Sequence, residues 1–313
     1  HFSSAVTACL DRPLRSGHYY LAACLVSVFY TLHLFPLDFF IGTAGFWFNT
    51  HTDPTQHITG MWAFAQDQWR FPLLHTRLLN APDGVSVAFT DSIPLAALLF
   101  KPIYAWLPAG SHYFGVWVFV CYVLQGMAGA WAAATIAGRS PAALCSGTLF
   151  ALMMPALMIR IPHAALLAQC MLIVMLVLYY QLNGARVSLK YFVVRAVLLL
   201  LLSAAIHLYL LAMLYTLYGA ALLDYAWRMR TRTGIARWVS LTLLPIPLLL
   251  LIFLALGFMS VSGGLPPAEN GFTESSMNLL SPLLGTHLAP SGFFPTEGTV
   301  LDATGLQIDG HNY

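Results

Sequence analysis

The amino-acid sequence predicts an all-α, polytopic membrane helix bundle of about seven spans. The chain of 313 residues is 59% hydrophobic and only 8% charged, with a mean hydropathy of +0.74. Soluble domains carry about 25% charged residues. The apolar residues fall in long runs, and most Lys and Arg residues fall in the segments between them. Most of the protein surface is therefore expected to face lipid.

Charge and cysteine content give no indication of a nucleic-acid-binding protein or of a disulfide-bonded or cysteine-ligated metal protein. The formal net charge is only +2, so nothing indicates a nucleic-acid partner. The five cysteines are scattered, and no CxxC or His/Cys metal spacing occurs among them. We interpret them as small core hydrophobes rather than disulfide partners; they are Cys9, Cys24, Cys121, Cys145 and Cys170.

The first apolar run, residues 19–35, follows two arginines and could belong to a signal peptide. The small residues at 43–45 come well after this run ends, and further apolar runs follow. A retained signal-anchor helix is therefore the better interpretation.

The ends of the chain suggest a fragment. It begins at His1 and stops at Tyr313 in a polar stretch. We therefore expect a transmembrane module over residues 1–259, followed by an outer loop or the start of a truncated C-terminal region over residues 260–313.

A long polar loop, residues 36–111, separates the first two spans. Within it, Asp53 followed by Pro54 is typical of a helix start, with Asp as the N-cap. The spacing predicts a helix from Pro54 to about Gln66 that lies along the membrane surface. Its apolar face would contain Ile58, Met61, Trp62 and Ala65.

Two apolar runs do not fit a single span. The run 93–108 is short, has Lys101 in its middle and contains three prolines, which favours an interfacial or re-entrant segment. The run 191–224 is too long for one span, and His207 lies near its centre. It is best divided into two short helices hinged at His207.

The distribution of Lys and Arg supports both choices, because cytoplasmic loops carry an excess of these residues. If 93–108 does not span and 191–224 forms two helices, seven basic residues all fall on the inner side: Arg139, Arg186, Lys190, Arg228, Arg230, Arg232 and Arg237. The predicted spans are then 19–35, 112–138, 141–158, 163–183, 191–206, 208–224 and 238–259.

Ionisable residues converge on the predicted outer side: Asp53, Asp91, Arg160, His163 and His207. Each has a plain structural alternative, such as helix capping by Asp53 or Asp91, headgroup contact by Arg160, or a buried core role for His207. Together they suit another task. A carboxylate can take a proton from an acceptor, an arginine can bind a lipid-linked phosphate, and histidines can orient either group. No DxD or HxxxH motif occurs, so no tightly held metal is implied, although a divalent cation remains an open option.

At this level the sequence resembles the GT-C superfamily of integral-membrane glycosyltransferases and, more narrowly, a bacterial membrane family of undetermined activity. The residues that carry the resemblance are Asp53-Pro54-Thr55-Gln56-His57, Trp69-Arg70-Phe71-Pro72, Phe89-Thr90-Asp91-Ser92-Ile93-Pro94-Leu95, Arg160-Ile161-Pro162-His163-Ala164-Ala165-Leu166-Leu167-Ala168 and His207-Leu208-Tyr209-Leu210-Leu211-Ala212-Met213. The shared layout is one N-terminal helix, a long outer loop that opens with an Asp, and further helices.

The resemblance implies that Asp53 is a catalytic base in sugar transfer from a polyprenyl-phosphate donor to an envelope glycan, lipid or protein. Several GT-C branches have a second acidic residue in the next outer loop, where this chain has Arg160 to His163. This departure suggests that phosphate binding falls to Arg160, His163 and His207. We expect the substrate-binding residues to be His57, Asp91, Arg160, His163, His207 and Tyr209. Tail residues such as Glu269, Glu274 and His287 cannot be assigned by motif.

The expected location is the bacterial inner membrane, with the active side toward the periplasm. The alternatives are a transporter or flippase of lipid-linked sugars and a non-catalytic subunit of an envelope-assembly complex. Proximity of Asp53 to Arg160, His163 or His207, within about 10 Å, would favour the enzyme because reacting groups need hydrogen-bond reach across a bound headgroup.

Overall fold

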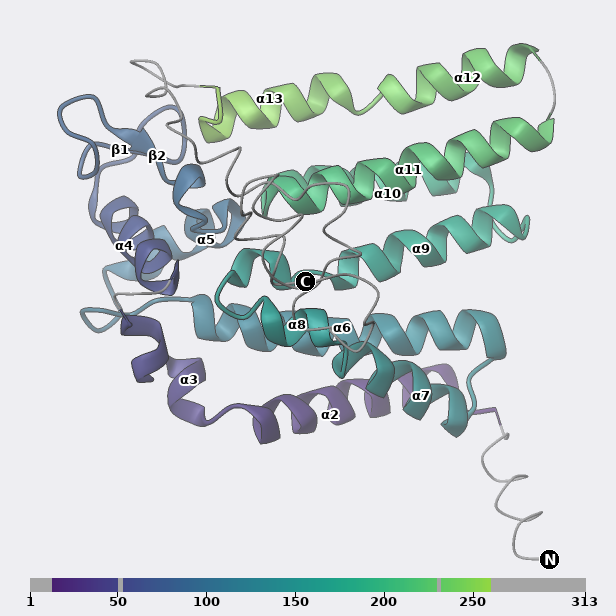
Figure 1. Ribbon diagram of the computed structural model, residues 1–313, viewed down its shortest axis with the longest axis horizontal. Helices are drawn as coiled ribbons and strands as arrows, with labels where there is room; N and C mark the ends of the chain where they lie inside the picture. The colour runs from purple at the N-terminus through teal and green to yellow at the C-terminus, as the bar shows by residue number, and fades with distance from the viewer. Residues whose placement is uncertain (1–12, 50–52, 230–231, 260–313) are drawn as a thin grey trace, which may run out of the picture. The chain divides into compact units, whose positions relative to one another are not determined.

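The computed structural model describes residues 13–49, 53–229 and 232–259, all within one unit that spans His1–Ser260 (Figure 1). This part of the chain is mostly helical. The N-terminal helix α2 (Ser16–Leu34) leads into the loop region, which contains α3 (Leu37–Ile41), η1 (Gly45–Phe48), α4 (Asp53–Gln66), β1 (His75–Thr76), β2 (Val85–Ser86), η2 (Val87–Thr90) and α5 (Pro94–Tyr104). The remaining elements are α6 (Phe114–Ala137), α7 (Pro141–Leu152), α8 (Pro155–Ile159), η3 (Ala164–Leu167), α9 (Cys170–Asn183), α10 (Leu189–Ala204), α11 (Leu208–Met229), α12 (Arg232–Leu243) and α13 (Ile246–Leu256). Residues 260–313, with Glu269, Glu274 and His287, lie outside the described part.

Five segments of the described chain are long and apolar enough to cross a membrane. They are Phe114–Ala137, Pro141–Ile159, Ala164–Asn183, Leu208–Arg228 and Gly234–Leu256. Five predicted spans are thereby confirmed in position, and the chain is a multi-pass membrane protein by length and composition.

The predicted number of seven spans is wrong, because two of the proposed spans do not meet these requirements. The helix at 191–206 is α10, which has only 16 residues and carries Lys190 and Arg195. The first helix, α2, has 19 residues, but His18, Ser27, Thr31 and His33 dilute its apolar character.

Several spans are broken by prolines or by a polar residue. Pro155 separates α7 from α8, and Pro245 separates α12 from α13, because proline lacks the N–H that continues the helical ladder. The predicted break at His207 is confirmed, since α10 ends at Ala204 and α11 begins at Leu208.

Glycines allow the first helices of the bundle to approach closely. A Cβ on Gly129 of α6 would lie 2.2 Å from the carbonyl oxygen of Gly147 in α7. A Cβ on Gly126 would lie 2.1 Å from the hydroxyl of Ser27 in α2. Small residues at such crossings bring helix backbones together, as is common inside membranes.

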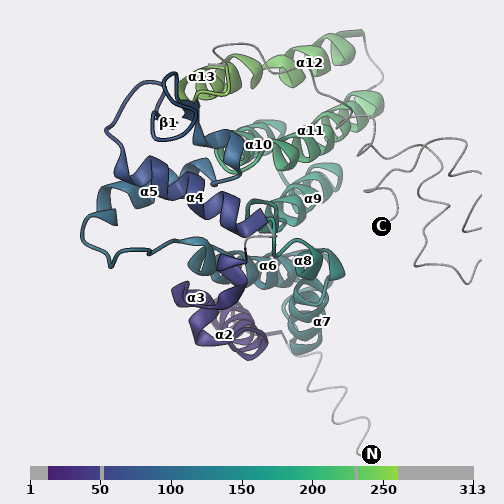
Figure 2. The ribbon, with the colours of Figure 1, turned by 60° about the vertical axis from the view of Figure 1, so that its left-hand side comes forward.

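The loop region 36–111 forms a structured layer at one end of the bundle, where both views show α4 beside α5 (Figures 1 and 2). The predicted helix after Asp53 is confirmed as α4, which begins at Asp53 itself. Its buried side includes His57, Ile58, Met61 and Phe64, so it packs into the layer. Tryptophans fix the layer through their indole N–H groups: Trp47 donates to the Phe39 carbonyl at 2.8 Å, and Trp62 to the Ser111 carbonyl at 3.0 Å.

The run 93–108 does not span, as predicted. Its helix α5 has 11 residues and is thus about 16 Å long, half the thickness of a bilayer core. Its Lys101 is buried in the layer, with Nζ 3.9 Å from the Phe64 ring and 3.3 Å from the Gln68 carbonyl oxygen. These contacts explain how a charged residue is accommodated in an apolar helix.

A short hairpin, β1 with β2, was not predicted. It is antiparallel, with His75 opposite Ser86. Two hydrogen bonds attach this region to the end of α13, from Leu73 N to Ala255 O at 2.7 Å and from Ser86 Oγ to Leu256 O at 2.8 Å. Strands of two residues carry no sequence periodicity, so tertiary contacts determine them.

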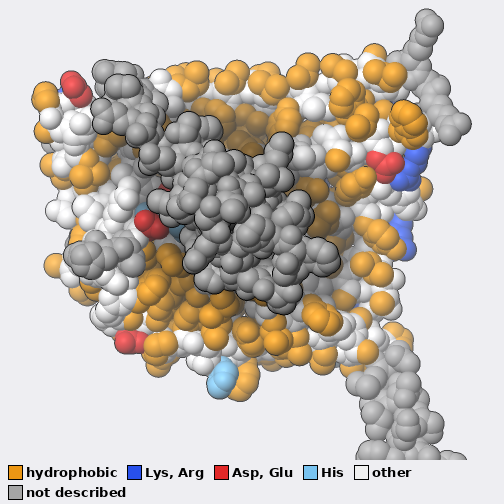
Figure 3. Space-filling model, viewed as in Figure 1, with side chains coloured by type: hydrophobic (Ala, Val, Ile, Leu, Met, Phe, Trp, Pro, Cys, Tyr) orange, Lys and Arg blue, Asp and Glu red, His pale blue; other side chains and the backbone are white. Residues whose placement is uncertain are grey.

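Basic residues gather at the end of the bundle opposite this layer. Arg186 donates to the Thr135 carbonyl near the end of α6, and Arg228 donates to the Asn183 carbonyl at the end of α9. Figure 3 shows Lys and Arg side chains at the same end. Which side of the membrane this end faces stays a prediction.

Candidate functional site

Five of the predicted site residues come together where the loop layer meets the spans. Asp53 and His57 lie one turn apart at the start of α4, on neighbouring positions of its surface. Asp91 follows η2, His163 precedes η3, and His207 lies in the break between α10 and α11. Four separate segments of the chain therefore contribute to one group, which we call the Asp–His cluster: Asp53, His57, Asp91, His163 and His207.

Asp53 and His163 form the first contact of the Asp–His cluster. Nε2 of His163 lies 3.1 Å from Oδ2 of Asp53. The two side chains are about half-exposed, at 40% for His163 and 49% for Asp53, so both are accessible to a ligand. His163 is thus one predicted site residue that the structure places beside Asp53.

His57 is the buried member of the cluster, with a side chain only 3% exposed. Its Nδ1 is buried without a hydrogen-bond partner, and its Nε2 lies 3.9 Å from Oδ2 of Asp91. This separation exceeds hydrogen-bond length. Burial is the main influence on this imidazole and lowers its pKa, since the charged form is poorly solvated there. His57 therefore presents a neutral ring to the cluster near pH 7.

Asp91 links His57 to His207. Its Oδ1 lies 3.3 Å from Nε2 of His207, and its Oδ2 faces His57. The hydrogen bond from His207 is the main reason that the pKa of Asp91 is lowered, so the carboxylate is charged at neutral pH.

His207 is held in one tautomer by the start of α11. Its Nδ1 accepts a hydrogen bond from the Tyr209 backbone N–H at 3.1 Å. The ring proton therefore lies on Nε2, where it is donated to Asp91. Because the break in the helix supplies this N–H, the hinge at His207 orients the side chain that meets Asp91.

The backbone around Asp91 is strained and well anchored. Asp91 and Ile93 have positive φ values of 52° and 46°, the second unusual for a β-branched residue. The Leu95 N–H donates to the Ala205 carbonyl at 2.6 Å, which ties this segment to the break before α11. Such strain persists where surrounding contacts determine the conformation, commonly at functional sites.

Hydroxyl groups join the Asp91 segment to α4. Ser92 Oγ donates to the His57 carbonyl at 2.8 Å and lies 2.7 Å from Thr90 Oγ1, while the Tyr113 hydroxyl donates to the Ser92 carbonyl. A Cβ on Gly60 would lie 2.1 Å from Thr90 Oγ1, so α4 needs glycine there to approach this closely.

The position of His163 is set by the turn before η3. Its backbone N–H donates to the Arg160 carbonyl at 3.0 Å, and Trp117 Nε1 donates to the Ala164 carbonyl at 2.9 Å. The contact between Arg160 and His163 is thus made by the Arg160 backbone, and Arg160 is partly buried three residues before His163.

A cavity of about 230 Å³ adjoins the cluster. Asp91 and His207 line it together with apolar and aromatic residues, namely Ala88, Phe89, Pro94, Ile206, Leu208, Tyr209 and Phe258. Tyr209, one of the predicted substrate-binding residues, therefore borders the cavity, whereas Asp53 is not part of its lining. A mostly apolar pocket with a few polar groups is typical of a ligand site.

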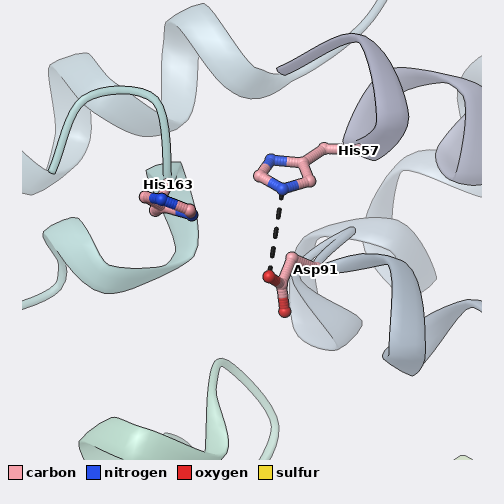
Figure 4. A group of neighbouring side chains, drawn as sticks. All are labelled: His57, Asp91 and His163. Carbon is pink, nitrogen blue, oxygen red and sulfur yellow. Dashed lines mark ion pairs between the residues drawn. The ribbon is translucent and has the colours of Figure 1, made fainter. Parts of the chain in front are cut away.

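Three members of the cluster could also hold a metal ion. One donor atom each from His57, Asp91 and His163 lie within 4.8 Å of one another. Figure 4 shows the three side chains pointing toward a common space from different elements. Their separation along the chain explains why no spacing motif predicted this donor set.

Sequence reasoning singled out Thr90 and Ser92 only as part of a matching stretch and did not predict the supporting roles that follow. Thr90, Ser92 and Tyr113 hold the Asp91 segment, and Gly60 allows α4 to reach it. Gly60 offered one signal, since glycine within a helix often marks a close contact. Phe258 offered none, because only the fold brings it to the cavity.

Comparison with known proteins and protein families places the chain in a family. No curated protein and no solved structure matches the chain. The family described as "Domain of unknown function (DUF6311)" matches residues 24–313. This match spans most of the sequence, and the chain belongs to the DUF6311 family.

Proposed function

We propose that the chain is a membrane glycosyltransferase that moves a sugar from a polyprenyl-phosphate donor to a cell-envelope acceptor. The observation that carries the proposal is the contact between Asp53 and His163, 3.1 Å long and half-exposed, within the Asp–His cluster. The GT-C resemblance assigns the base role to the same Asp53. A carboxylate whose orientation is fixed by an imidazole suits proton abstraction.

In the proposed reaction, an acceptor hydroxyl attacks the anomeric carbon of the sugar. A new carbon–oxygen bond forms to the acceptor, and the bond from the anomeric carbon to the phosphate oxygen breaks. The acceptor proton passes to Asp53, and the electron pair of the broken bond leaves with the polyprenyl phosphate. His163 keeps the Asp53 carboxylate aimed at the acceptor through its Nε2.

The phosphate requires donors on the other side of the sugar. Arg160 lies one turn from His163 and offers a guanidinium group, whose fork matches phosphate oxygens. Cavity residues such as His207 and Tyr209 lie beside Asp91 and can contact the sugar or its phosphate. The lipid chain would remain in the membrane, next to the apolar surface of the spans.

Deletion of the gene in its native host, followed by comparison of envelope glycans, tests this proposal. We expect one glycan to lose a sugar residue while its polyprenyl-linked donor accumulates. Wild-type protein and the Asp83→Asn variant should restore the glycan, because Asp83 is an exposed loop carboxylate outside the cluster. Asp53→Asn should not. Restoration by Asp53→Asn would contradict the proposal.

A further inference from the structure

His57, Asp91 and His163 place one possible ligand atom each within 4.8 Å of one another, and the buried His57 ring is incompletely hydrogen-bonded. Nε2 of His57 faces the Asp91 carboxylate at 3.9 Å, a distance too long for a hydrogen bond, and Nδ1 of the same buried ring has no partner. A buried imidazole normally finds partners for its nitrogens. Nδ1 lies on the side of the ring away from Asp91, whereas Nε2 and the carboxylate oxygen face each other across a gap in which a cation would bind both (Figure 4).

The distances between the three donor atoms fit metal coordination after small movements of the side chains. Donor atoms from the three residues lie within 4.8 Å of one another. Ligands bound at about 2.1 Å around a tetrahedral ion lie about 3.4 Å apart, so the donors need only to draw together around the ion. His163 and Asp91 are partly exposed and can rotate toward buried His57.

Neighbouring residues occupy the positions of outer-shell partners. Nε2 of His207 lies 3.3 Å from Oδ1 of Asp91, which leaves Oδ2 directed at His57. Asp53 lies 3.1 Å from Nε2 of His163. Carboxylates and hydrogen-bonded groups of this kind commonly fix the orientation of metal ligands.

We propose that His57, Asp91 and His163 bind a divalent transition-metal ion of the Zn²⁺ class, with one coordination position left open. Two imidazoles and one carboxylate form a donor set that zinc accepts, whereas Mg²⁺ and Ca²⁺ prefer oxygen ligands alone. The two carboxylates of the cluster supply the negative charge that balances a divalent cation. Three protein ligands and an open position are typical of zinc sites that bind a substrate or water. The site does not depend on the proposed sugar transfer.

Metal binding to the purified full chain in detergent tests this site without any activity assay. The protein is treated with a chelator, dialysed against Zn²⁺ and analysed for metal by atomic emission. Affinity is measured by competition with a chromophoric chelator. We expect about one Zn²⁺ per chain and a rise in the thermal unfolding midpoint with Zn²⁺ but not with Mg²⁺.

Variants of the two partly exposed ligands should lower the affinity while the fold is retained. His163→Ala and Asp91→Asn are each expected to weaken Zn²⁺ binding by at least about tenfold, since even outer-shell changes cost 10- to 100-fold. His18→Ala is the matched control, because His18 is exposed near the start of α2 and is not a member of the Asp–His cluster. Wild-type protein that retains no more zinc than the His163→Ala and Asp91→Asn variants, or variants that keep the wild-type affinity, would overturn the proposal.

Discussion

Nε2 of His163, at the start of a predicted membrane span, lies 3.1 Å from Oδ2 of Asp53, at the start of α4 in the loop layer. This contact joins two segments that are distant in sequence. It ties Asp53 of the long polar loop to the bundle. His57 extends the group to Asp91, and Asp91 extends it to His207.

The His163→Ala variant should show whether His163 orients the Asp53 carboxylate or only stabilises the fold. Its side chain is 40% exposed, so we expect the free energy of unfolding to change by no more than about 0.5 kcal/mol. Sugar transfer should fall by at least about tenfold, yet by less than the roughly 10²- to 10⁴-fold expected for the base itself. Thermal unfolding in detergent and the transfer rate check the two halves. If the loss of transfer were fully accounted for by unfolding of the variant protein, His163 would have only a structural role.

The Gly60→Ala variant should disturb the Asp91 segment. The new Cβ would meet Thr90 Oγ1 at 2.1 Å, and overpacking of this kind costs about 1–3 kcal/mol. The helix gains back about 0.5–1 kcal/mol from alanine. We therefore expect a lower unfolding midpoint together with reduced transfer.

Gly219→Ala in α11 is the control for this variant, because a Cβ there meets nothing within 4 Å. It should leave stability unchanged or slightly raised. If the two glycine variants behave alike, the close approach of α4 to Thr90 is not a constraint on the fold.

Asp67 should make the loop layer sensitive to acid. Its carboxylate, 7% exposed, accepts from Arg70 Nη2 at 2.5 Å, from the Arg77 N–H at 2.7 Å and from Thr76 Oγ1 at 3.0 Å. The hydrogen bond from Arg70 is the main reason that the pKa of Asp67 is lowered. A lowered folded-state pKa adds stability that is fully present above the unfolded-state pKa of about 4 and is lost as the pH falls toward the folded-state value.

The Asp67→Asn variant should therefore unfold more easily than the wild type at pH 7, by about 1–3 kcal/mol, because its amide leaves donors unpaired. The difference should shrink below about pH 4. Thermal unfolding between pH 3 and pH 7 measures this, with Asp83→Asn as the control. A difference that does not vary with pH would contradict the assignment to the charged carboxylate.

Local patterns in the sequence were sufficient for much of the fold. Hydrophobic runs located five spans, the Asp53-Pro54 pair located the start of α4 within one residue, and His207 marked the break before α11. These features depend on composition and on capping within one segment. The predicted number of spans was wrong because α10 is too short and because the polar residues of α2 reduce its apolar character.

From the sequence, the candidate site could be predicted only as a set of residues on the same side of the membrane, without their contacts. The approach of His57 to Asp91 depends on Gly60, on the positive φ values at Asp91 and Ile93, and on the bond from Leu95 to Ala205. The hairpin depends on contacts with the end of α13. Such long-range contacts leave no periodicity in the sequence.

The role of Asp53 can be measured most directly by chasing a labelled sugar from the polyprenyl-linked pool into envelope material in membranes that contain wild-type or variant protein. We predict that Asp53→Asn protein is present in the membrane at the wild-type level and that its label stays in the lipid pool, with transfer reduced by roughly 10²- to 10⁴-fold. Asp83→Asn should transfer label normally. Transfer by Asp53→Asn at the wild-type rate would contradict the proposal that Asp53 is the base of a glycosyltransferase.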